Sequence, residues 1–283
     1  MSYSMNQLYR EIGISKQAVY RYAARQATFD SNMQQLTLEA EELREAHPGC
    51  GVEKMYYTLK PDFIGRDRFI DTFMQLGYRL KKIKNYHRTT YAGKIYYPNL
   101  IKGMVVDSPG QVWQSDLTYI QVGDRFYYAV FIIDVYSKQI VGYKVSDHMR
   151  ATANVEALKM ALKHHKPPDI HHSDRGSQYT YKGYLDLLKA HGCKVSMSLI
   201  APENAYAERI NGTIKNEYIK HWKPTSFQQL NQQVKRAVNS YNHKRPHDSL
   251  NKLNPIEFEA YWATLEKGNR PLTKIYNEEL NYN

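Results

Sequence analysis

The sequence predicts an α/β protein, with a mixed sheet of about five strands flanked by helices and a small all-helical region before it. Residues 106–146 hold three runs rich in β-branched and aromatic side chains, and residues 151–222 alternate helix-period segments with short apolar runs. Residues 1–80 show helix-period patterns alone. At 283 residues the chain is long enough for two domains.

The chain is basic, with 39 Lys and Arg residues against 28 Asp and Glu, a net charge of +11. This imbalance favours a polyanionic partner, and nucleic acid is the first candidate; a basic protein without such a partner is the alternative. No long apolar run or signal-peptide core occurs, so we expect a cytoplasmic, nucleoid-associated protein without membrane contact. Cys50 and Cys193 alone cannot form a disulfide framework or a cysteine zinc site, and we expect them to be packing residues.

Residues 1–30 are predicted to form a helix-turn-helix-like segment. Apolar residues surround a turn at Gly13, and Ser15 is placed to cap the second helix. Helix-turn-helix segments place their second helix in the major groove of DNA, so Lys16 and Arg21 are candidate DNA contacts. Simple packing of two helices is the alternative.

Residues 31–80 are predicted to form a helical DNA-binding domain, and residues 81–105 a basic linker. Pro48 and Gly49 break the first helix of the domain, and Gly77 is suited to ending the last. Between Thr72 and Val106 there is no acidic residue, while basic residues alternate with tyrosines that can stack on bases. We therefore predict a linker that lies along DNA, rather than a plain solvated spacer, with phosphate contacts from Lys81, Lys82, Lys84 and Arg88.

Residues 106–222 are predicted to form the catalytic core. The first three strands are VWQSDLTYIQV, RFYYAVFIIDVYS and QIVGYKVSD, and a tight turn at Gly123-Asp124 joins the first two. Helices and strands then alternate through ATANVEALKMALKHH, DIHHSD, TYKGYLDLLKAHG, KVSMSL and AYAERINGTIKNEYIKHW. The resulting order, βββαβαβα, is the ribonuclease-H-like topology.

Three carboxylates fall at positions of this topology that can converge at one edge of the sheet. Asp116 lies in the first strand, Asp174 at the end of the fourth, and Glu208 near the start of the last helix. Three such groups would hold two Mg²⁺ ions, with Mn²⁺ as a substitute, for phosphodiester chemistry. The alternative is that each is an ordinary surface acid, as we expect for Asp147, Asp169 and Asp186 and, despite its buried-looking strand, for Asp134.

Four segments resemble the integrase-core segments of bacterial insertion-sequence transposases: WQSDLTYI, HSDRGSQY, NAYAERINGTIKNE and YNHKRPHDSLNKLNPIEF. More closely, residues 40–262 resemble the second-frame product (OrfB) of the insertion-sequence three family, related in fold to retroviral integrases. The resemblance implies that Asp116 and Asp174 are the metal-binding aspartates and that Glu208 completes a DDE triad.

The resemblance also implies a basic residue near the DNA end, which matches Lys215. Asn211 shares its helix face, and Arg209 is a further candidate DNA contact. We expect His172 and Gln178 to border the catalytic edge and to support the metal ligands.

One departure from the family pattern is visible. Thirty-three residues separate Asp174 from Glu208, two fewer than is common, and the shortening falls in the loop SLIAPENAYAE. Loops tolerate deletions, so we keep Glu208 in the triad, with Glu203 and Glu217 as weaker substitutes.

Two segments follow the core. Residues 223–262 are predicted to be a C-terminal helical extension, and residues 263–283 a tail with little periodicity that is either partly disordered or an oligomer contact.

The resemblance implies a transposase that binds the terminal inverted repeats of its own element and carries out metal-dependent strand cleavage and strand transfer into target DNA. Two ends must be held together, so we expect a homo-oligomer on double-stranded DNA, and the family implies a first-frame partner (OrfA). A non-catalytic DNA-binding regulator derived from a transposase is the main alternative. A tyrosine recombinase and a ribonuclease of the same fold are the others.

Overall fold

The computed structural model describes residues 5–80 and 96–275; Lys81, Lys82, Lys84 and Arg88 of the predicted linker lie outside them. The chain divides into two compact units, Met1–Ala46 with Gly51–Arg79 and His47–Cys50 with Leu80–Asn283. Within the described ranges, no helix combines the length and the apolar character needed to cross a membrane.

The first unit contains four helices: α1 (Met5–Glu11), α2 (Lys16–Ala46), α3 (Val52–Leu59) and α4 (Arg66–Gln75). The turn between α1 and α2 lies where the sequence predicts it, because Gly13 has a φ of 67° and the hydroxyl of Ser15 accepts a hydrogen bond from the Ala18 N–H at 3.1 Å. At the other end of the unit, Phe69 stacks on Phe73 with ring centroids 4.2 Å apart.

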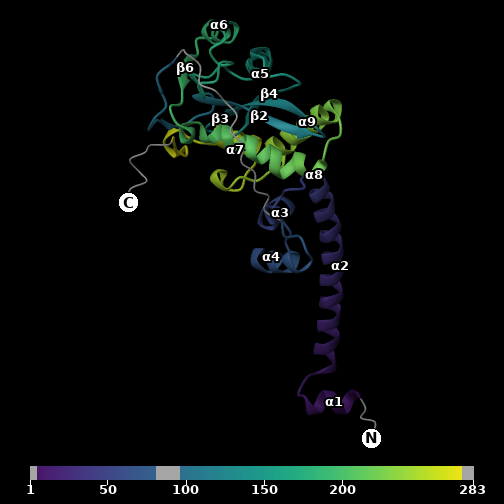
Figure 1. Cartoon of the computed structure of the whole chain (residues 1–283). Helices are drawn as coiled ribbons and strands as arrows, with labels where there is room; N and C mark the ends of the chain where they lie inside the picture. The colour runs from purple at the N-terminus through teal and green to yellow at the C-terminus, as the bar shows by residue number, and fades with distance from the viewer. Residues whose placement is uncertain (1–4, 81–95, 276–283) are drawn as a thin grey trace. The chain divides into compact units, whose positions relative to one another are not determined.

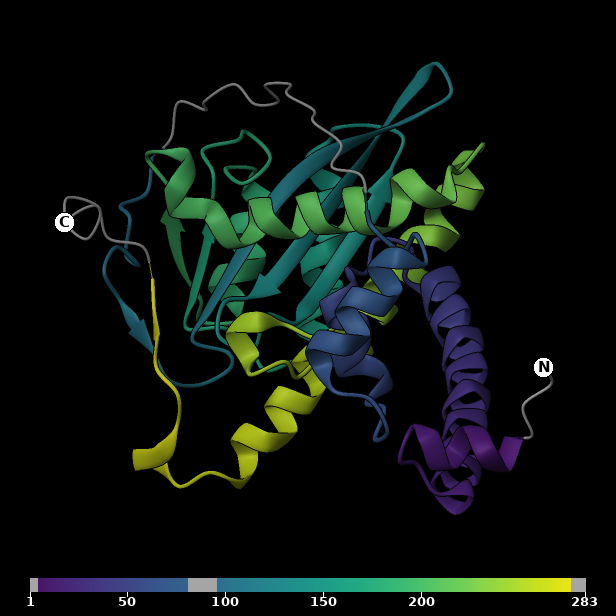
Figure 2. The ribbon, with the colours of Figure 1, turned by 90° about the horizontal axis from the view of Figure 1, so that it is seen from below.

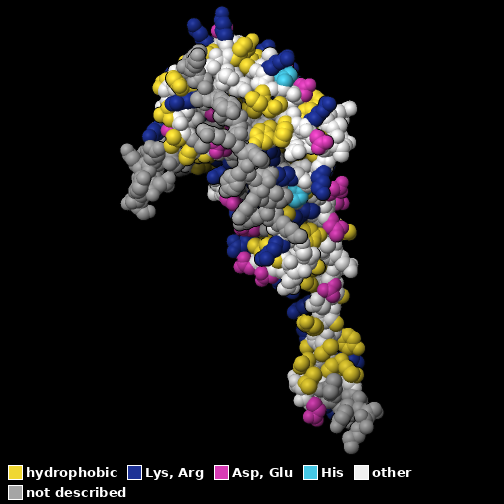
Figure 3. Space-filling view, viewed as in Figure 1, with side chains coloured by type: hydrophobic (Ala, Val, Ile, Leu, Met, Phe, Trp, Pro, Cys, Tyr) yellow, Lys and Arg dark blue, Asp and Glu magenta, His cyan; other side chains and the backbone are white. Residues whose placement is uncertain are grey.

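One expectation for this unit is wrong. The boundary at residue 30 does not exist, because α2 continues across it without interruption (Figure 1). No Gly or Pro interrupts residues 16–46, so nothing in the sequence stops the helix. Around the turn, Ile12, Ile14 and Tyr22 are exposed, and hydrophobic side chains gather on this part of the unit (Figure 3).

The second unit contains the predicted five-stranded mixed sheet. Its strands are β2 (Val112–Val122), β3 (Arg125–Asp134), β4 (Ile140–Ser146), β5 (Ile170–Ser173) and β6 (Lys194–Met197). They lie in the order β4-β3-β2-β5-β6, in which β3 is antiparallel to both β4 and β2, and β5 is parallel to both β2 and β6. The alternating helices fall where the sequence places them, which confirms the βββαβαβα order.

Helices cover both faces of this sheet. On one face, α5 (Ala151–His164) and α6 (Lys182–Ala190) pack against Trp113, Leu117 and Ile132. The other face carries a continuous helical run of α7 (Ala205–Thr213), a π-helical turn η2 (Ile214–Ile219) and α8 (Lys220–Trp222), together with α9 (Phe227–His243). Figure 2 shows this run crossing the strands. Because side chains alternate along β2, Asp116 faces the α7 side and Leu117 the α5 side.

The segments after the core pack against it. Helix α9, which lies in the predicted C-terminal helical extension, shares one apolar cluster with the sheet. The chain continues through η3 (Asp248–Leu250), α10 (Pro255–Thr264) and η4 (Lys267–Asn269) into β7 (Thr273–Lys274), which pairs antiparallel with β1 (Val105–Val106). Ile275 is buried beside Val106, so the described part of the tail closes the unit.

Candidate active site

The three predicted carboxylates come from three different elements of the second unit. Asp116 is the first residue of β2 beyond the stretch that pairs with β5, since that pairing covers Val112–Ser115. Asp174 directly follows β5, and Glu208 lies in the first turn of α7. The parallel pairing of β2 with β5 therefore brings Asp116 and Asp174 to the same edge, and α7 brings Glu208 over it.

Their electrostatics show that the three groups are close. Burial, followed by the charges of Asp174 and Glu208, raises the pKa of Asp116 to about 8. Partial burial and the charge of Asp174 raise the pKa of Glu208 as well. The Leu117 N–H and the Asn211 amide, at 2.9 and 2.7 Å, donate to Asp116 and partly offset this effect.

Backbone geometry fixes the Asp174 carboxylate. The Gly176 N–H donates to Asp174 Oδ1 at 2.9 Å. A Cβ on residue 176 would lie 2.9 Å from that oxygen and 2.8 Å from Gln178 Oε1, so a side chain here would have to displace the Asp174 carboxylate or the Gln178 amide. Beneath it, the buried Tyr179 hydroxyl is 3.0 Å from the Ser115 hydroxyl.

The donor set fits hard divalent cations. Asp116 is partly buried beside neutral donors and two further carboxylates, so a bound cation would relieve the repulsion that contributes to its raised pKa. Across the described residues, however, no group of three or more His, Cys, Asp or Glu side chains is already arranged to hold a metal ion. The carboxylates are near enough to repel one another, and they would have to close around an ion to bind it.

A groove of about 880 Å³ begins at Asp116 and Glu208. One wall is the run of β2 from Asp116 to Val122, and the other is formed by α7, η2 and the residues after α8. Asn211 and Lys215 both line it, on the helix face that the sequence predicts for them. Lys220 and Lys223 extend its basic wall.

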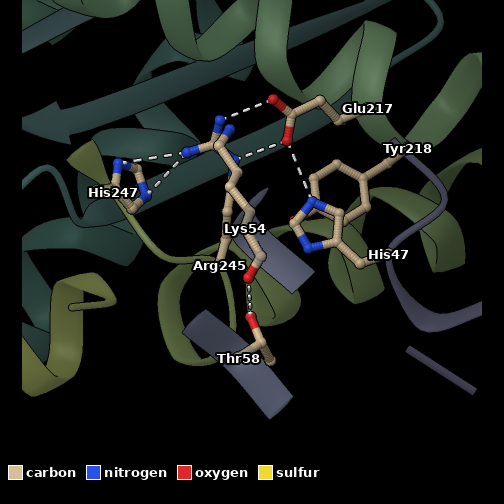
Figure 4. Close-up of polar contacts among 7 residues, drawn as sticks. All are labelled: His47, Lys54, Thr58, Glu217, Tyr218, Arg245 and His247. Atoms are coloured by element: carbon tan, nitrogen blue, oxygen red, sulfur yellow. Dashed lines mark hydrogen bonds and ion pairs between the residues drawn. The ribbon is translucent and has the colours of Figure 1, made fainter. Parts of the chain in front are cut away.

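The π-helical turn that carries Lys215 is held by a polar cluster (Figure 4). Both carboxylate oxygens of Glu217 accept hydrogen bonds from Arg245, each at 2.7 Å, and His47 lies 3.1 Å from one of them. The Gly49 N–H donates to the Glu217 carbonyl oxygen at 2.6 Å, and the His47 ring stacks on Tyr218. A π-helical turn has weaker internal hydrogen bonding than an α-helix, so these outside partners stabilise it.

The other candidate residues lie in different places. His172 is buried on β5 and shares a hydrogen bond of 2.8 Å with the Ser196 hydroxyl, and burial lowers its pKa to about 4. Gln178 donates to the Met149 carbonyl oxygen at 3.3 Å. Arg209 lines a separate hollow with Tyr206 and Lys274, so it lies outside the Asp116 groove. Lys16 and Arg21 belong to the first unit, where Lys16 lies 5.6 Å from the Tyr20 ring centroid.

The weaker substitutes for Glu208 are engaged elsewhere. Glu203 is buried and accepts the Leu199 N–H at 2.5 Å, and Glu217 belongs to the Arg245 cluster. Asp134 is not a surface acid as expected, because it is buried and accepts hydrogen bonds from the N–H groups of Gly110, Tyr136 and Ser137. These acids are structural. Cys50 and Cys193 are both buried, as expected for packing residues.

Two positioning residues were not identified from the sequence. The Gln114 side chain donates to the Glu203 carbonyl at 3.2 Å and accepts the Tyr206 and Ala207 N–H groups at 3.1 and 3.4 Å. Asn204 donates to the Ser115 carbonyl at 3.1 Å. Together they tie the start of α7 to β2 and so set Glu208 over Asp116. The signal for Gln114 was its place in WQSD, two residues before Asp116.

Comparisons with known proteins agree with this geometry. Two family models, both described as integrase core domain, match residues 106–201 and 194–255. The "Insertion element IS600 uncharacterized 31 kDa protein" of Shigella sonnei is 34% identical over 203 residues, which cover 69% of this chain and 75% of that protein. The transposase for insertion sequence element IS904 of Lactococcus lactis is 32% identical over 64% of this chain and 73% of that protein.

Two further matches extend the comparison. The transposase for IS629 of Shigella sonnei is 38% identical, over 57% of this chain and only 56% of that protein. The simian T-cell lymphotropic virus intasome, solved in complex with the PP2A regulatory subunit B56 gamma, matches with a TM-score of 0.53 and 13% identity over 77% of this chain and 71% of that chain. At that identity the likeness shows the fold alone. From its sequence relatives, its matched domain and its sheet, the chain belongs to the insertion-sequence three (IS3) family of transposases and carries an integrase catalytic core with the ribonuclease-H-like fold.

Proposed function

We propose that this transposase cleaves and joins DNA strands at the terminal inverted repeats of an insertion sequence, with Asp116, Asp174 and Glu208 as its metal-binding catalytic residues. One observation carries the proposal: the pKa of the partly buried Asp116 is raised to about 8, by desolvation and by two further carboxylates, at the mouth of a groove with a basic wall. Perturbed acids of this kind are concentrated at functional sites.

Two Mg²⁺ or Mn²⁺ ions held there would activate the attacking water or 3′ hydroxyl and neutralise the leaving oxygen. The chain's own residues prepare the site. Asn211 orients Asp116 through its amide at 2.7 Å, and the Gly176 N–H fixes Asp174. Gln114 holds the start of α7, so that Glu208 stays above β2.

DNA is the substrate that fits the surroundings of the carboxylates. Lys215, Lys220 and Lys223 line one wall of the groove, where they can neutralise phosphates. Because a transposition reaction joins two ends, we expect a homo-oligomer on DNA and a contribution from a first-frame partner to end recognition. We expect this reaction to take place in the bacterial cytoplasm.

The test is cleavage and joining of a labelled DNA fragment that carries the element's own ends, in Mg²⁺ and with the first-frame protein present. Asp116→Asn, Asp174→Asn and Glu208→Gln should each bind the fragment like wild type but lose both reactions by roughly a hundredfold or more. The control is Asp186→Asn, an exposed acid on α6, which should react like wild type. Ca²⁺ should support binding with little cleavage.

The same assay distinguishes the proposed function from the alternative of a non-catalytic DNA-binding regulator. If the wild type binds the ends but never cuts them, the chain is a DNA-binding regulator. Cleavage that continues at the same rate in EDTA would rule out the metal mechanism.

A further inference from the structure

The β2 wall of the groove beside the carboxylates is the open edge of a strand. On its β5 side, β2 is paired over Val112–Ser115 only, and among the described residues no strand covers it from Asp116 onward. The groove follows this edge from Asp116 to the hairpin at Gly123. At about 3.3 Å per residue, the edge from Asp116 to Val122 spans about 20 Å, which is room for a few nucleotides.

The far end of the groove is aromatic. Phe126, the second residue of β3, is 52% exposed and meets the Tyr119 ring edge-on, with centroids 5.6 Å apart. Both side chains line the groove. A large apolar ring exposed on a hairpin beside a charged groove is suited to stacking, since every nucleobase offers an aromatic face.

The opposite wall is basic. Lys215 lies with its ammonium 5.6 Å from the Tyr119 ring centroid, and Lys220 and Lys223 follow along η2 and α8. Burial, followed by the charge of Lys220, lowers the pKa of Lys215, and a nearby phosphate would offset both effects because its negative charge favours the ammonium form. A phosphate backbone on the lysine side would leave the bases facing the aromatic side.

From this arrangement we propose that the groove holds unpaired nucleotides of the DNA strand next to the cleavage site, with a base stacked on Phe126, which Tyr119 supports edge-on, and phosphates on Lys215, Lys220 and Lys223. The inference rests on the proposed function for the identity of the neighbouring reaction. A base can stack face to face on the exposed Phe126 ring only after it has left the base stack of a duplex, so the arrangement is suited to a strand end that has left the helix.

The first experiment measures binding in EDTA, so that its result does not depend on catalysis. A labelled single-stranded six-nucleotide probe is titrated with the full chain, either wild type, Phe126→Ala or Phe126→Tyr. We expect Phe126→Ala to weaken binding roughly tenfold and Phe126→Tyr to bind like wild type, because the ring is kept. Tyr261→Ala is the matched control, since Tyr261 is a 45% exposed ring on α10 outside the groove.

The second experiment measures cleavage of element ends whose terminal base pairs are either matched or mismatched. Phe126→Ala should be slow on matched ends and recover on mismatched ends, because mismatches supply the unpaired strand that the Phe126 ring otherwise stabilises. Loss of cleavage on both substrates, with probe binding unchanged, would overturn the stacking role of Phe126 and leave the proposed function unaffected. A change in oligomeric mass on Phe126→Ala, with unchanged probe binding, would overturn it in favour of a protein contact.

Discussion

His171 and His172 lie side by side on β5, and both are buried. Burial lowers the pKa of His171 to about 3 and that of His172 to about 4, from an ordinary value of 6.5. Between pH 6.5 and about 4, both histidines become protonated in the unfolded chain but stay neutral in the folded chain. Their neutral forms therefore support folding above pH 6.5, and this stability is lost as the pH falls toward 4.

We expect the free energy of unfolding to fall by about 1.4 kcal/mol per pH unit for each histidine between pH 6.5 and 4.5. Urea unfolding at several pH values measures this slope. His171→Gln should flatten the slope by about one proton, although it also perturbs the hydrogen bond of 2.9 Å with the Tyr184 hydroxyl and lowers stability at pH 7.5. His221→Gln, at an exposed position on α8, should keep the wild-type slope. An unchanged slope in His171→Gln would contradict the assignment.

Among single residues, the convergence of the three carboxylates could be predicted, and the residues that support them could not. The places of Asp116, Asp174 and Glu208 in the predicted strands and helix put them at one edge of the sheet, and their charges do interact. Gln114 and Asn204 are ordinary polar residues whose hydrogen bonds join positions 89 or more residues apart. No local pattern records such a partner.

At the scale of elements, the turn η2 depends on a glycine far away in the chain. Gly49 lies so close to Glu217 that a Cβ would overlap the Glu217 Cα, and its N–H holds the Glu217 carbonyl. We predict that Gly49→Ala costs 1–3 kcal/mol of unfolding free energy and slows DNA cleavage, because the turn that carries Lys215 shifts. Gly268→Ala is the control, since no atom lies within 4 Å of its Cβ. Equal stability of the two variants, measured by urea unfolding, would contradict this role.

The elements themselves were predictable wherever a period was strong. The strands β2, β3 and β4 follow from alternating β-branched and aromatic residues, and α5 from its apolar face. The π-helical turn was not predicted, because residues 205–222 read as one helix and the contacts that widen it come from Gly49 and Arg245. The false boundary in α2 arose because two segments were predicted separately, although no residue breaks the helix between them.

At the scale of the molecule, the net charge of +11 predicts DNA binding that weakens steeply with salt. Two triple variants with equal net charge distinguish this general effect of charge from phosphate contacts made in the groove. Lys→Gln changes at 215, 220 and 223 should lower the slope of log affinity against log salt by up to about 3, at about 0.9 per phosphate contact. The same changes at the exposed residues 159, 163 and 166 of α5 and the loop after it should leave the slope nearly unchanged. Equal losses in both would mean that charge alone attracts the DNA.

The segments around the core were predicted less well than the core itself. The periodic segments placed the sheet correctly, but the described part of the tail after α10 showed no period because it holds only the short turn η4, the two residues of β7 and the buried Ile275. Such contacts depend on β1, whose partner lies nearly 170 residues away. Only the folded chain reveals them.

The pairing of β1 with β7 joins the beginning of the core to its end, at Val105 opposite Lys274. The two ends of the core therefore lie side by side, so they could be joined to each other and the chain opened elsewhere. A circular permutant that links residue 275 to residue 104 through a short glycine linker, and opens the chain at the exposed β2–β3 hairpin near Asp124, should retain the sheet. Such a rearranged protein would offer a place to attach a reporter beside the groove.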